Sequence, residues 1–350
     1  MGSLEKIDKN FKVDTNIDKE DIVFYDVLDA PFDIRGVFFE NGKFRRLPES
    51  VAKSVSEGVY FLHANTSGGR VRFKTNSPYI AISAKMDGIG KRAHFAMAGS
   101  TGFDIYVKKE GKFQYYRTFM PPVDIKDGYE SVVEFDSNEC REVKINFPLY
   151  TNVCGLHIGV SDKAEVSAPC AYKNEKKIVY YGSSITQGAC ASRPGNSYQG
   201  MIERKFDCDY LNLGFSGSAI AEKEMVDYIA GLDMDIFVYD YDFNAPSNEH
   251  LRNTHSVMFK AIREAHPSLP IIIMSRPKLF LTKEEEERLS IIKNTYDNAK
   301  NAGDSNVYFI PGKKLMALTN NDGTVDNVHP NDLGFYSMAE ALSEVLEKIM

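Results

Sequence analysis

Cysteine is scarce in this chain, and its spacing is irregular. The five cysteines are odd in number, and none belongs to a C-x-x-C pair or to the Cys/His spacing of a zinc site. They are Cys140, Cys154, Cys170, Cys190 and Cys208. A disulfide framework and a structural metal are therefore not expected, and reduced thiols in a cytoplasm are the simplest interpretation. We predict that the protein needs no metal ion and no cofactor.

Long apolar runs and blocks of basic residues are also missing. No apolar run approaches the roughly 18–20 residues of a membrane span, so we expect no membrane partner. The formal net charge is −7, without a basic block, which argues against nucleic acid as a partner. Residues 1–6 show no basic segment leading into an apolar one, so a cytoplasmic location is expected. Secretion stays open if a leader was removed.

The pattern of the sequence changes near residue 175. A chain of 350 residues is long for one core and suits two domains. Before residue 175, short β-branched and aromatic runs are separated by glycine, proline and Asn-Gly turns, which is typical of a β-sandwich. The clearest predicted strands are residues 70–74, 79–84, 103–107, 113–117 and 142–146.

After residue 175, apolar strands alternate with helical stretches. The alternation predicts a doubly wound α/β sheet, in which ligands bind beyond the carboxyl ends of the strands. The predicted strands are residues 178–181, 210–213, 236–239, 271–274 and 307–310, and the predicted helices are residues 197–206, 222–230, 249–265, 283–302 and 332–349. With a linker near residues 167–170, the expected domains are residues 1–168 and residues 169–350.

The most informative stretch is residues 177–188, where an apolar strand runs into a turn that holds serine between glycines. A serine hydroxyl becomes a nucleophile when an imidazole takes its proton and a carboxylate orients that imidazole. Asp326 and His329 lie three positions apart and can supply both groups from one loop. We therefore predict Ser184 as nucleophile, His329 as base and Asp326 as its partner. Because Thr186 stands where glycine is required, this is not the elbow of the α/β-hydrolases.

The same residues resemble conserved blocks of the SGNH, or GDSL-like, hydrolases. Residues 182–186, Gly-Ser-Ser-Ile-Thr, resemble the family's G-D-S-[IL]-T block, with Ser183 in the place of its aspartate. Residues 326–330 match the D-x-x-H-P block in full. Two further blocks occur in the right order between them, and four blocks together are far more specific than any one alone.

The resemblance implies an oxyanion hole made of three donors. Residues 212–218 resemble the family's second block and put one backbone N–H donor on Gly217. The strand before Asn244 resembles the third block and makes the Asn244 amide a second donor, beside the N–H of Ser184. This block departs from the family, because Asp242 replaces the usual glycine and Ala245 the usual aspartate.

The N-terminal half carries a further resemblance. Residues 102–107, Gly-Phe-Asp-Ile-Tyr-Val, resemble the G-x-D-L-Y signature of a jelly-roll domain that precedes the hydrolase in one bacterial branch of the family. The resemblance implies an all-β jelly-roll sandwich followed by an SGNH-type, flavodoxin-like hydrolase domain with a three-layer parallel sheet.

Each candidate residue also has a structural explanation. Ser184 and His329 fit helix-capping positions, Gly217 fits a tight turn, and Asn244 fits an Asx-turn. Three more residues are candidates for substrate contact: Arg193, Tyr181 and Asp242. For Arg193 we favour pinning of a loop over substrate contact, and core packing is the simpler explanation of Tyr181. The remaining histidines are assigned no role: His63, His94, His157, His250, His255 and His266.

These observations predict a serine esterase of the SGNH type that removes short acyl groups, most simply acetyl, from a carbohydrate. The preference for carbohydrate is implied by the family branch and not by particular residues. The expected partner is a small-molecule or oligosaccharide ester, and the oligomeric state is open. A thioesterase or lysophospholipase of the same fold, and a glycan-binding protein with an inert hydrolase domain, are the alternatives.

Overall fold

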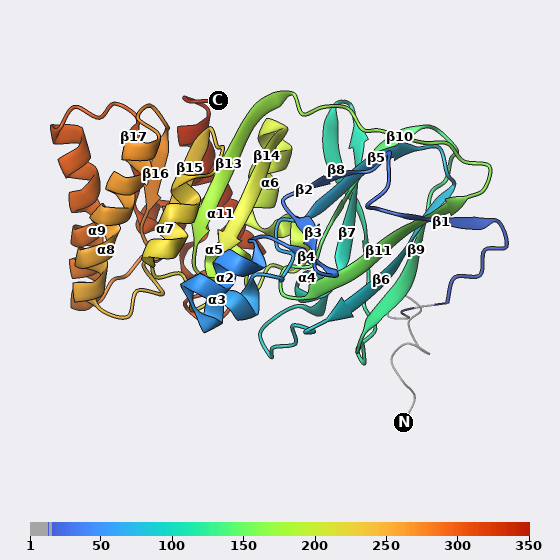
Figure 1. The fold of residues 1–350 in the computed structure, drawn as a ribbon, viewed down its shortest axis with the longest axis horizontal. Helices are drawn as coiled ribbons and strands as arrows, with labels where there is room; N and C mark the ends of the chain where they lie inside the picture. The colour runs from blue at the N-terminus through green and yellow to red at the C-terminus, as the bar shows by residue number, and fades with distance from the viewer. Residues whose placement is uncertain (1–12, 14–15) are drawn as a thin grey trace.

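A computed structural model describes residue 13 and residues 16–350 of the chain. Residues 1–6, on which the expectation of a cytoplasmic location depends, lie outside the described residues. The chain forms two parts that lie next to each other along the long axis of the molecule (Figure 1). Among the helices of the described part, none is both long enough and apolar enough to cross a membrane.

The first part is a sandwich of two antiparallel sheets. One sheet has the order β1(Ile22–Asp26), β11(Asn152–Ser161), β6(Tyr79–Asp87) and β9(Gly128–Glu134). The other has the order β12(Val166–Ser167), β5(Arg70–Thr75), β10(Arg141–Asn146), β7(Phe103–Lys109) and β8(Lys112–Phe119), with β2(Asp33–Arg35) also paired to β5. A hairpin of β3(Phe38–Glu40) and β4(Lys43–Arg45) and the short α4(Met97–Ser100) complete it.

The core of the sandwich follows from the alternation of side chains along its strands. Val71 and Phe73 from one sheet and Ile80 and Ile82 from the other are fully buried in one apolar cluster. Successive side chains of a strand point to opposite faces, so residues two apart share the core side. The predicted β-sandwich is confirmed.

The second part is a five-stranded parallel sheet in the order β14(Cys208–Gly214), β13(Asn174–Gly182), β15(Ile236–Asp240), β16(Ile271–Met274) and β17(Val307–Ile310). One face packs against α7(Lys223–Ala230), α8(Asn248–Ala265) and α9(Lys283–Asn301), and the other against α6(Tyr198–Phe206) and α11(Asp332–Leu346). Short elements lie in the connections: α5(Ser184–Gln187), η2(Pro194–Asn196), α10(Gly312–Leu315) and η3(Asn320–Gly323). The predicted flavodoxin-like arrangement, a parallel sheet between two layers of helices, is confirmed.

Two helices of the N-terminal half pack on the hydrolase sheet and were not predicted. They are α2(Glu49–Val55) and α3(Glu57–Leu62), and Figure 1 shows them beside the α/β part. Ala52 and Val59 are buried in the same cluster as Leu213 and Phe215 of the second part. The two domains therefore share a hydrophobic core along one edge of the parallel sheet.

Buried charges also join the domains. Arg70 and Lys144 lie on the outer face of the larger sandwich sheet, yet both side chains are almost completely buried. Lys144 pairs with Glu203 of α6, and Arg70 pairs with Asp209 of β14. A buried charge is tolerated only when it is paired with an opposite charge. These two ion pairs therefore fix how the domains pack against each other along this face.

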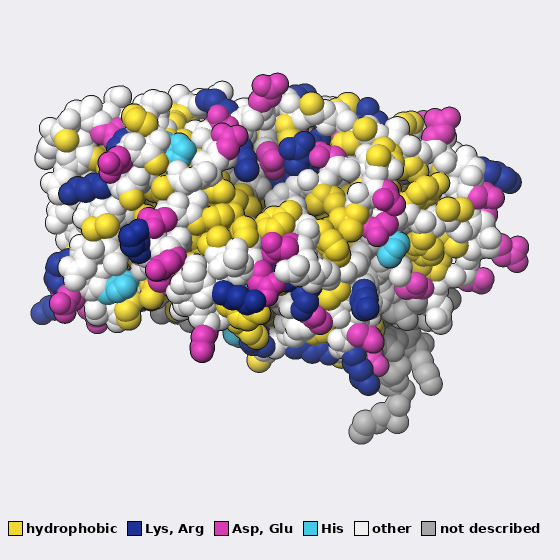
Figure 2. Space-filling model, in the orientation of Figure 1, with side chains coloured by type: hydrophobic (Ala, Val, Ile, Leu, Met, Phe, Trp, Pro, Cys, Tyr) yellow, Lys and Arg dark blue, Asp and Glu magenta, His cyan; other side chains and the backbone are white. Residues whose placement is uncertain are grey.

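Hydrophobic side chains gather across the middle of the face shown in Figure 2. A shallow cavity lies at the junction of the domains, to which the sandwich contributes Ile34 and Val37 and the α/β domain Tyr228 and Leu232. Its lining includes none of the predicted site residues.

The strand order places the ligand site. The chain starts the sheet at β13 and adds β14 on one side and β15 on the other, so the order reverses at β13. Gly182, the last residue of β13, pairs with Gly214 of β14 and with Asp240 of β15. Crevices for ligands open at such reversal points, beyond the carboxyl ends of the strands. Ser184 and Asn244 follow two of these ends directly.

Candidate active site

Ser184 lies in a turn that the local sequence holds firmly. It is the first residue of α5, shortly after the end of β13, and it is 8% exposed. The side chain of Ser183 caps α5 by accepting a hydrogen bond from the N–H of Ile185 at 3.2 Å. The N–H of Ser183 donates to the carbonyl of Asp240 on the neighbouring strand at 3.1 Å. Serine is a good N-cap, so Ser183 holds the turn in place of the aspartate that the family usually has at this position.

The loop after η3 brings His329 and Asp326 to this serine. Ser184 Oγ lies 3.0 Å from His329 Nε2, and His329 Nδ1 lies 2.7 Å from Asp326 Oδ2. With a proton on Nδ1 donated to the carboxylate, Nε2 is left free to accept the serine proton. The sequence motifs named these three residues, and the structure places them within hydrogen-bonding distance in the order that nucleophilic catalysis requires.

Asp326 is fixed as a carboxylate. Its Oδ1 accepts hydrogen bonds from the backbone N–H groups of His329 at 2.8 Å and Val328 at 3.1 Å. Partial burial acts to raise the pKa of Asp326, but these bonds and the imidazole of His329 outweigh it, so the pKa lies below its ordinary value. The loop itself is closed by the N–H of Val325, which donates to the carbonyl of His329 at 2.9 Å.

Gly217 lies in the turn after β14, and Asn244, which follows β15, reaches that turn with its side chain. The Asn244 side-chain amide donates to the carbonyl of Phe215, two residues before Gly217, at 2.9 Å. An amide has two N–H donors, so one stays available for a substrate. Gly217 has φ +70°, and a side chain added there would meet nothing within 4 Å, which leaves open space beside it. The N–H of Ser184, at the first position of α5, has no acceptor within its own helix.

The loop of Asn244 is held by two arginines that the sequence did not single out. Asp242 is 1% exposed, and its carboxylate accepts hydrogen bonds from Arg276 Nε at 2.8 Å and from Arg288 Nε at 2.8 Å. Burial acts to raise the pKa of Asp242, but the two guanidinium groups outweigh it and hold the pKa below its ordinary value. Arg288 also donates to the backbone carbonyl of Ala245 at 2.7 Å. Asp242 thus positions the loop, and we do not assign it a substrate contact.

Tyr181 also turns out to serve structure. It is 1% exposed in the core cluster beneath α7 and α8, and its hydroxyl accepts the N–H of Ala221 at 2.8 Å. No face of its ring is open to a ligand, so the predicted aromatic contact with substrate is corrected to core packing.

Arg193 joins the domains at the G-x-D-L-Y motif. Its guanidinium donates to Asp104 Oδ2 at 3.1 Å and to the Tyr106 hydroxyl, and it stacks 3.8 Å from the ring centroid of Tyr115. The N–H of Gly195 donates to the same Asp104 oxygen at 2.9 Å, and a side chain on Gly195 would collide with the Tyr106 ring. The polar residues of the motif therefore clamp the loop after the nucleophile, and the structural explanation of Arg193 accounts for its contacts.

Residues of the sandwich also hydrogen-bond to the turn that carries Ser184. The Tyr150 hydroxyl donates to the backbone carbonyl of Ser184 at 3.2 Å, and the Ser67 hydroxyl donates to that of Gln187 at 2.6 Å. The Gln187 side chain in turn accepts the N–H of Ser216, next to Gly217, at 3.0 Å. These contacts couple the position of the oxyanion turn to the N-terminal domain.

Asp240 is a buried carboxyl group that sequence reasoning missed. It ends β15 at 2% exposure, and neither carboxylate oxygen has a hydrogen-bond partner among the described residues. Burial, with the nearby charge of Asp242, raises its pKa to about 8. The group is therefore mostly neutral at pH 7, and a short polar residue at the end of an apolar strand was the only signal that marked it.

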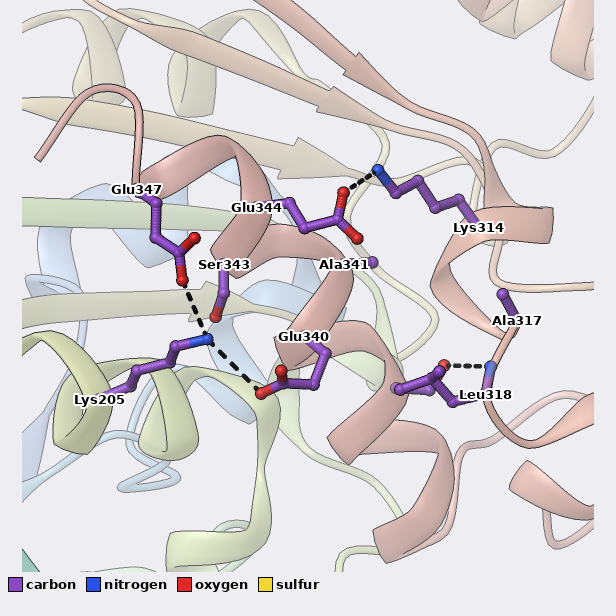
Figure 3. Close-up of a pocket in the computed structure, with 10 residues that line it drawn as sticks. Lys205, Lys314, Ala317, Leu318, Glu340, Ala341, Ser343, Glu344 and Glu347 are labelled. Atoms are coloured by element: carbon purple, nitrogen blue, oxygen red, sulfur yellow. Dashed lines mark hydrogen bonds and ion pairs between the residues drawn. The ribbon is translucent and has the colours of Figure 1, made fainter.

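Figure 3 shows a surface groove along α11 that is also lined by Lys205 of α6 and Lys314 of α10. Its charges pair with one another: Lys205 with Glu340 and Glu347, and Lys314 with Glu344. None of the predicted site residues lines it. The groove is therefore separate from the candidate active site.

Comparisons with known proteins agree with the motifs. Residues 175–347 match the GDSL-like Lipase/Acylhydrolase family, and residues 22–166 match GxDLY, the N-terminus of the SGNH hydrolase type of esterase. None of the curated proteins compared with this chain matched it. The chain belongs to the SGNH, or GDSL-like, hydrolases with a GxDLY N-terminal domain, and this membership supports ester hydrolysis.

Solved structures resemble the whole chain. A protein described as a GDSL-like lipase from Bacteroides ovatus ATCC 8483 is 28% identical, with 94% of this chain and 98% of that chain covered and a TM-score of 0.84. The salicylyl-acyltransferase SsfX3 of a tetracycline biosynthetic pathway is 17% identical, with the same coverage and a TM-score of 0.77. A family two carbohydrate esterase from Cellvibrio japonicus is 12% identical, again with that coverage and a TM-score of 0.64. The last two show a shared fold.

Removal of the Asn244 amide tests the oxyanion assignment. We expect Asn244→Ala to lower kcat by about 10²–10³-fold, because one preorganised donor to the tetrahedral intermediate is lost. Steady-state kinetics on p-nitrophenyl acetate measure this, with circular dichroism to follow folding. Asn294→Ala, on the exposed face of α9, is the matched control and should keep the parental rate. An Asn244→Ala enzyme within a few-fold of the parent would remove this residue from the oxyanion hole.

Proposed function

We propose that this protein is a serine esterase that removes short acyl groups, in particular acetyl, from carbohydrate esters. The observation that carries the proposal is the chain of contacts Ser184–His329–Asp326, at 3.0 and 2.7 Å, at the reversal point of the parallel sheet. A hydroxyl, an imidazole and a carboxylate in this order make up a nucleophile, its base and the group that orients the base.

The reaction proceeds through an acyl-enzyme. His329 Nε2 takes the proton of Ser184 as Oγ attacks the ester carbonyl, and Asp326 stabilises the imidazolium that forms. The N–H groups of Ser184 and Gly217 and the amide of Asn244 hold the negative oxygen. The imidazolium then gives its proton to the leaving alcohol. Water, deprotonated by His329, releases the carboxylic acid and restores the serine.

A small cavity on the sandwich side is lined by none of the predicted catalytic or oxyanion residues, but it lies one residue away from the nucleophile turn and would suit a compact substrate. It measures about 250 Å³ and is lined by Phe61, Phe95 and Tyr150 together with Arg92 and neighbouring polar residues. Tyr150 connects it to the nucleophile through its bond to the Ser184 carbonyl. This volume lies below the roughly 300–1,000 Å³ of pockets for drug-sized ligands. Aromatic rings beside polar groups suit one sugar ring better than a long acyl chain. The similar fold of a carbohydrate esterase also favours this substrate class.

The length of the acyl chain gives a direct prediction. Small residues lie at both ends of the turn and short helix that hold Ser184: Gly182, Ser183, Gly188 and Ala189. A methylene group that cannot be seated costs roughly 1–3 kcal/mol in the transition state, so kcat/KM should fall about tenfold or more from acetyl to butyryl esters. A series of p-nitrophenyl esters measures this. Faster hydrolysis of an octanoyl ester than of acetyl would favour a lipase-like enzyme instead.

The same assay separates the other candidate functions. An acetylated oligosaccharide, an acetyl thioester and a lysophospholipid are offered to the same protein, and kcat/KM is compared. We expect the acetylated oligosaccharide to be the best of the three. A preference for the thioester or the lysophospholipid would reassign the substrate class, and a complete lack of turnover would favour a glycan-binding protein with an inert hydrolase domain.

A further inference from the structure

A histidine and a cysteine that the reaction does not use lie beside the catalytic histidine. One nitrogen each of His94 and His329 and the sulfur of Cys190 all lie within 4.8 Å of one another. The rings of His94 and His329 have centroids 5.5 Å apart. We propose that these three side chains form an inhibitory binding site for Zn²⁺ or a similar thiophilic divalent cation.

The three ligands come from separate segments of both domains. His94 is exposed on the sandwich segment between β6 and α4, and its neighbour Phe95 is anchored by a ring contact of 4.5 Å with Tyr150. Cys190 is 8% exposed on the loop after α5. His329 lies on the loop before α11. A metal bound here would tie the N-terminal domain to the two loops that carry the nucleophile and its base.

The loop of Cys190 is held in place. The N–H of Ser192 donates to Asp332 Oδ1 at 2.8 Å, and the Asn196 amide donates to Asp332 Oδ2 at 2.7 Å, at the start of α11. The thiol thus stays near His329, which precedes the same helix, while the exposed His94 is free to adjust. A tetrahedral zinc site needs ligand atoms roughly 3.3–3.8 Å apart, so small shifts of these side chains from spacings of at most 4.8 Å complete the contacts.

The donor set selects the metal. Two imidazoles and a thiolate suit Zn²⁺ and exclude Mg²⁺ and Ca²⁺, which take oxygen ligands. The thiol proton of Cys190 is released to solvent when the metal binds. Three protein ligands leave a fourth position for water.

Occupancy of this site is incompatible with catalysis. His329 Nδ1 is held by Asp326, so Nε2 is the nitrogen that is left for a metal. This nitrogen also contacts Ser184 Oγ and must accept its proton. The carboxylate–histidine pair that orients a base is the same arrangement that supports histidine ligands of zinc. Zinc and the serine proton therefore compete for one atom, and zinc inhibits reversibly.

Inhibition of p-nitrophenyl acetate hydrolysis by ZnCl₂ tests the site in the full chain. We expect zinc to inhibit, EDTA to restore the rate, and MgCl₂ to have no effect. His94→Ala and Cys190→Ser should raise the zinc concentration for half-inhibition about tenfold or more, because each removes a ligand. Their rates without metal should stay within a few-fold of the parent. The exposed His157→Ala and Cys140→Ser are matched controls. Equal inhibition of all variants, or an equal shift in the controls, would overturn the proposal.

A second readout does not depend on turnover. Co²⁺ added to the Ser184→Ala protein should produce a near-ultraviolet thiolate-to-metal absorption band, which is lost when Cys190→Ser is added to the same protein. A band that persists without Cys190, or no band at all, would contradict the site. If the parent protein fails to hydrolyse esters while the band is present, the proposed function fails and the metal site stands.

Discussion

Ser184→Ala is expected to lower kcat for ester hydrolysis by about 10⁴-fold or more, because it removes the hydroxyl that we propose as the nucleophile. The fold should survive, since α5 is held by the Ser183 cap and by backbone contacts that alanine preserves. Steady-state kinetics and thermal unfolding measure both effects.

Ser183→Ala is the matched control, because it removes the same atom from the neighbouring residue. It should cost about 1 kcal/mol of stability through loss of the N-cap and lower the rate less than tenfold. Activity of Ser184→Ala within a few-fold of the parent, or an equal loss in both variants, would argue against Ser184 as the nucleophile.

Asp326→Asn is expected to slow turnover by about 10³–10⁴-fold without unfolding the protein. An asparagine amide donates toward His329 Nδ1, which favours the tautomer with its proton on Nε2, and that nitrogen then cannot accept the proton of Ser184. Kinetics at saturating p-nitrophenyl acetate measure the change in kcat. Asp322→Asn, an exposed aspartate in η3, is the control and should leave kcat unchanged. An Asp326→Asn enzyme as fast as the parent would exclude Asp326 from the orienting role.

The predictable elements of the fold are those in which apolar residues recur with the clear spacing of a strand or a helix. All five parallel strands and the five long helices of the second part occur where the pattern predicted them, with ends that differ by a few residues. The helices α2 and α3 were missed, although Leu47, Ala52, Val55, Val59 and Leu62 lie on one side of a helical pattern. Their short length and their position among strands favoured a loop, and their burial depends on a sheet formed more than a hundred residues later.

The site residues that could be predicted were likewise those marked by a short local motif, and those that depend on distant contacts were not. Ser184 and the pair Asp326 and His329 stood out because each sits in a short motif whose chemistry is visible in a few residues. The roles of Tyr181 and Asp242 were not visible, because they depend on Ala221 and on Arg276 and Arg288, which lie far along the chain. Strand ends place a residue near a site, but only packing decides whether its side chain reaches the substrate.

The contribution of the N-terminal domain also depends on distant contacts. Asp104 and Tyr106 were noticed as part of a motif, but nothing local indicated that they hold Arg193 and Gly195 of the loop after the nucleophile. Likewise, His94 was given no role, and its position beside His329 became evident only in three dimensions. The sandwich is therefore part of the active-site framework and not an appended module.

Covalent labelling by a fluorophosphonate tests the central claim most directly, because the probe reacts only with a serine that is activated as a nucleophile. The full-length parent, His329→Ala and Ser184→Ala are each treated with the probe, and the modified peptide is identified by mass spectrometry. We predict one labelled residue, Ser184, in the parent, strongly reduced labelling in His329→Ala, and none in Ser184→Ala. Labelling of another residue, or an active parent that remains unlabelled, would contradict the assignment of Ser184 as a nucleophile activated by His329.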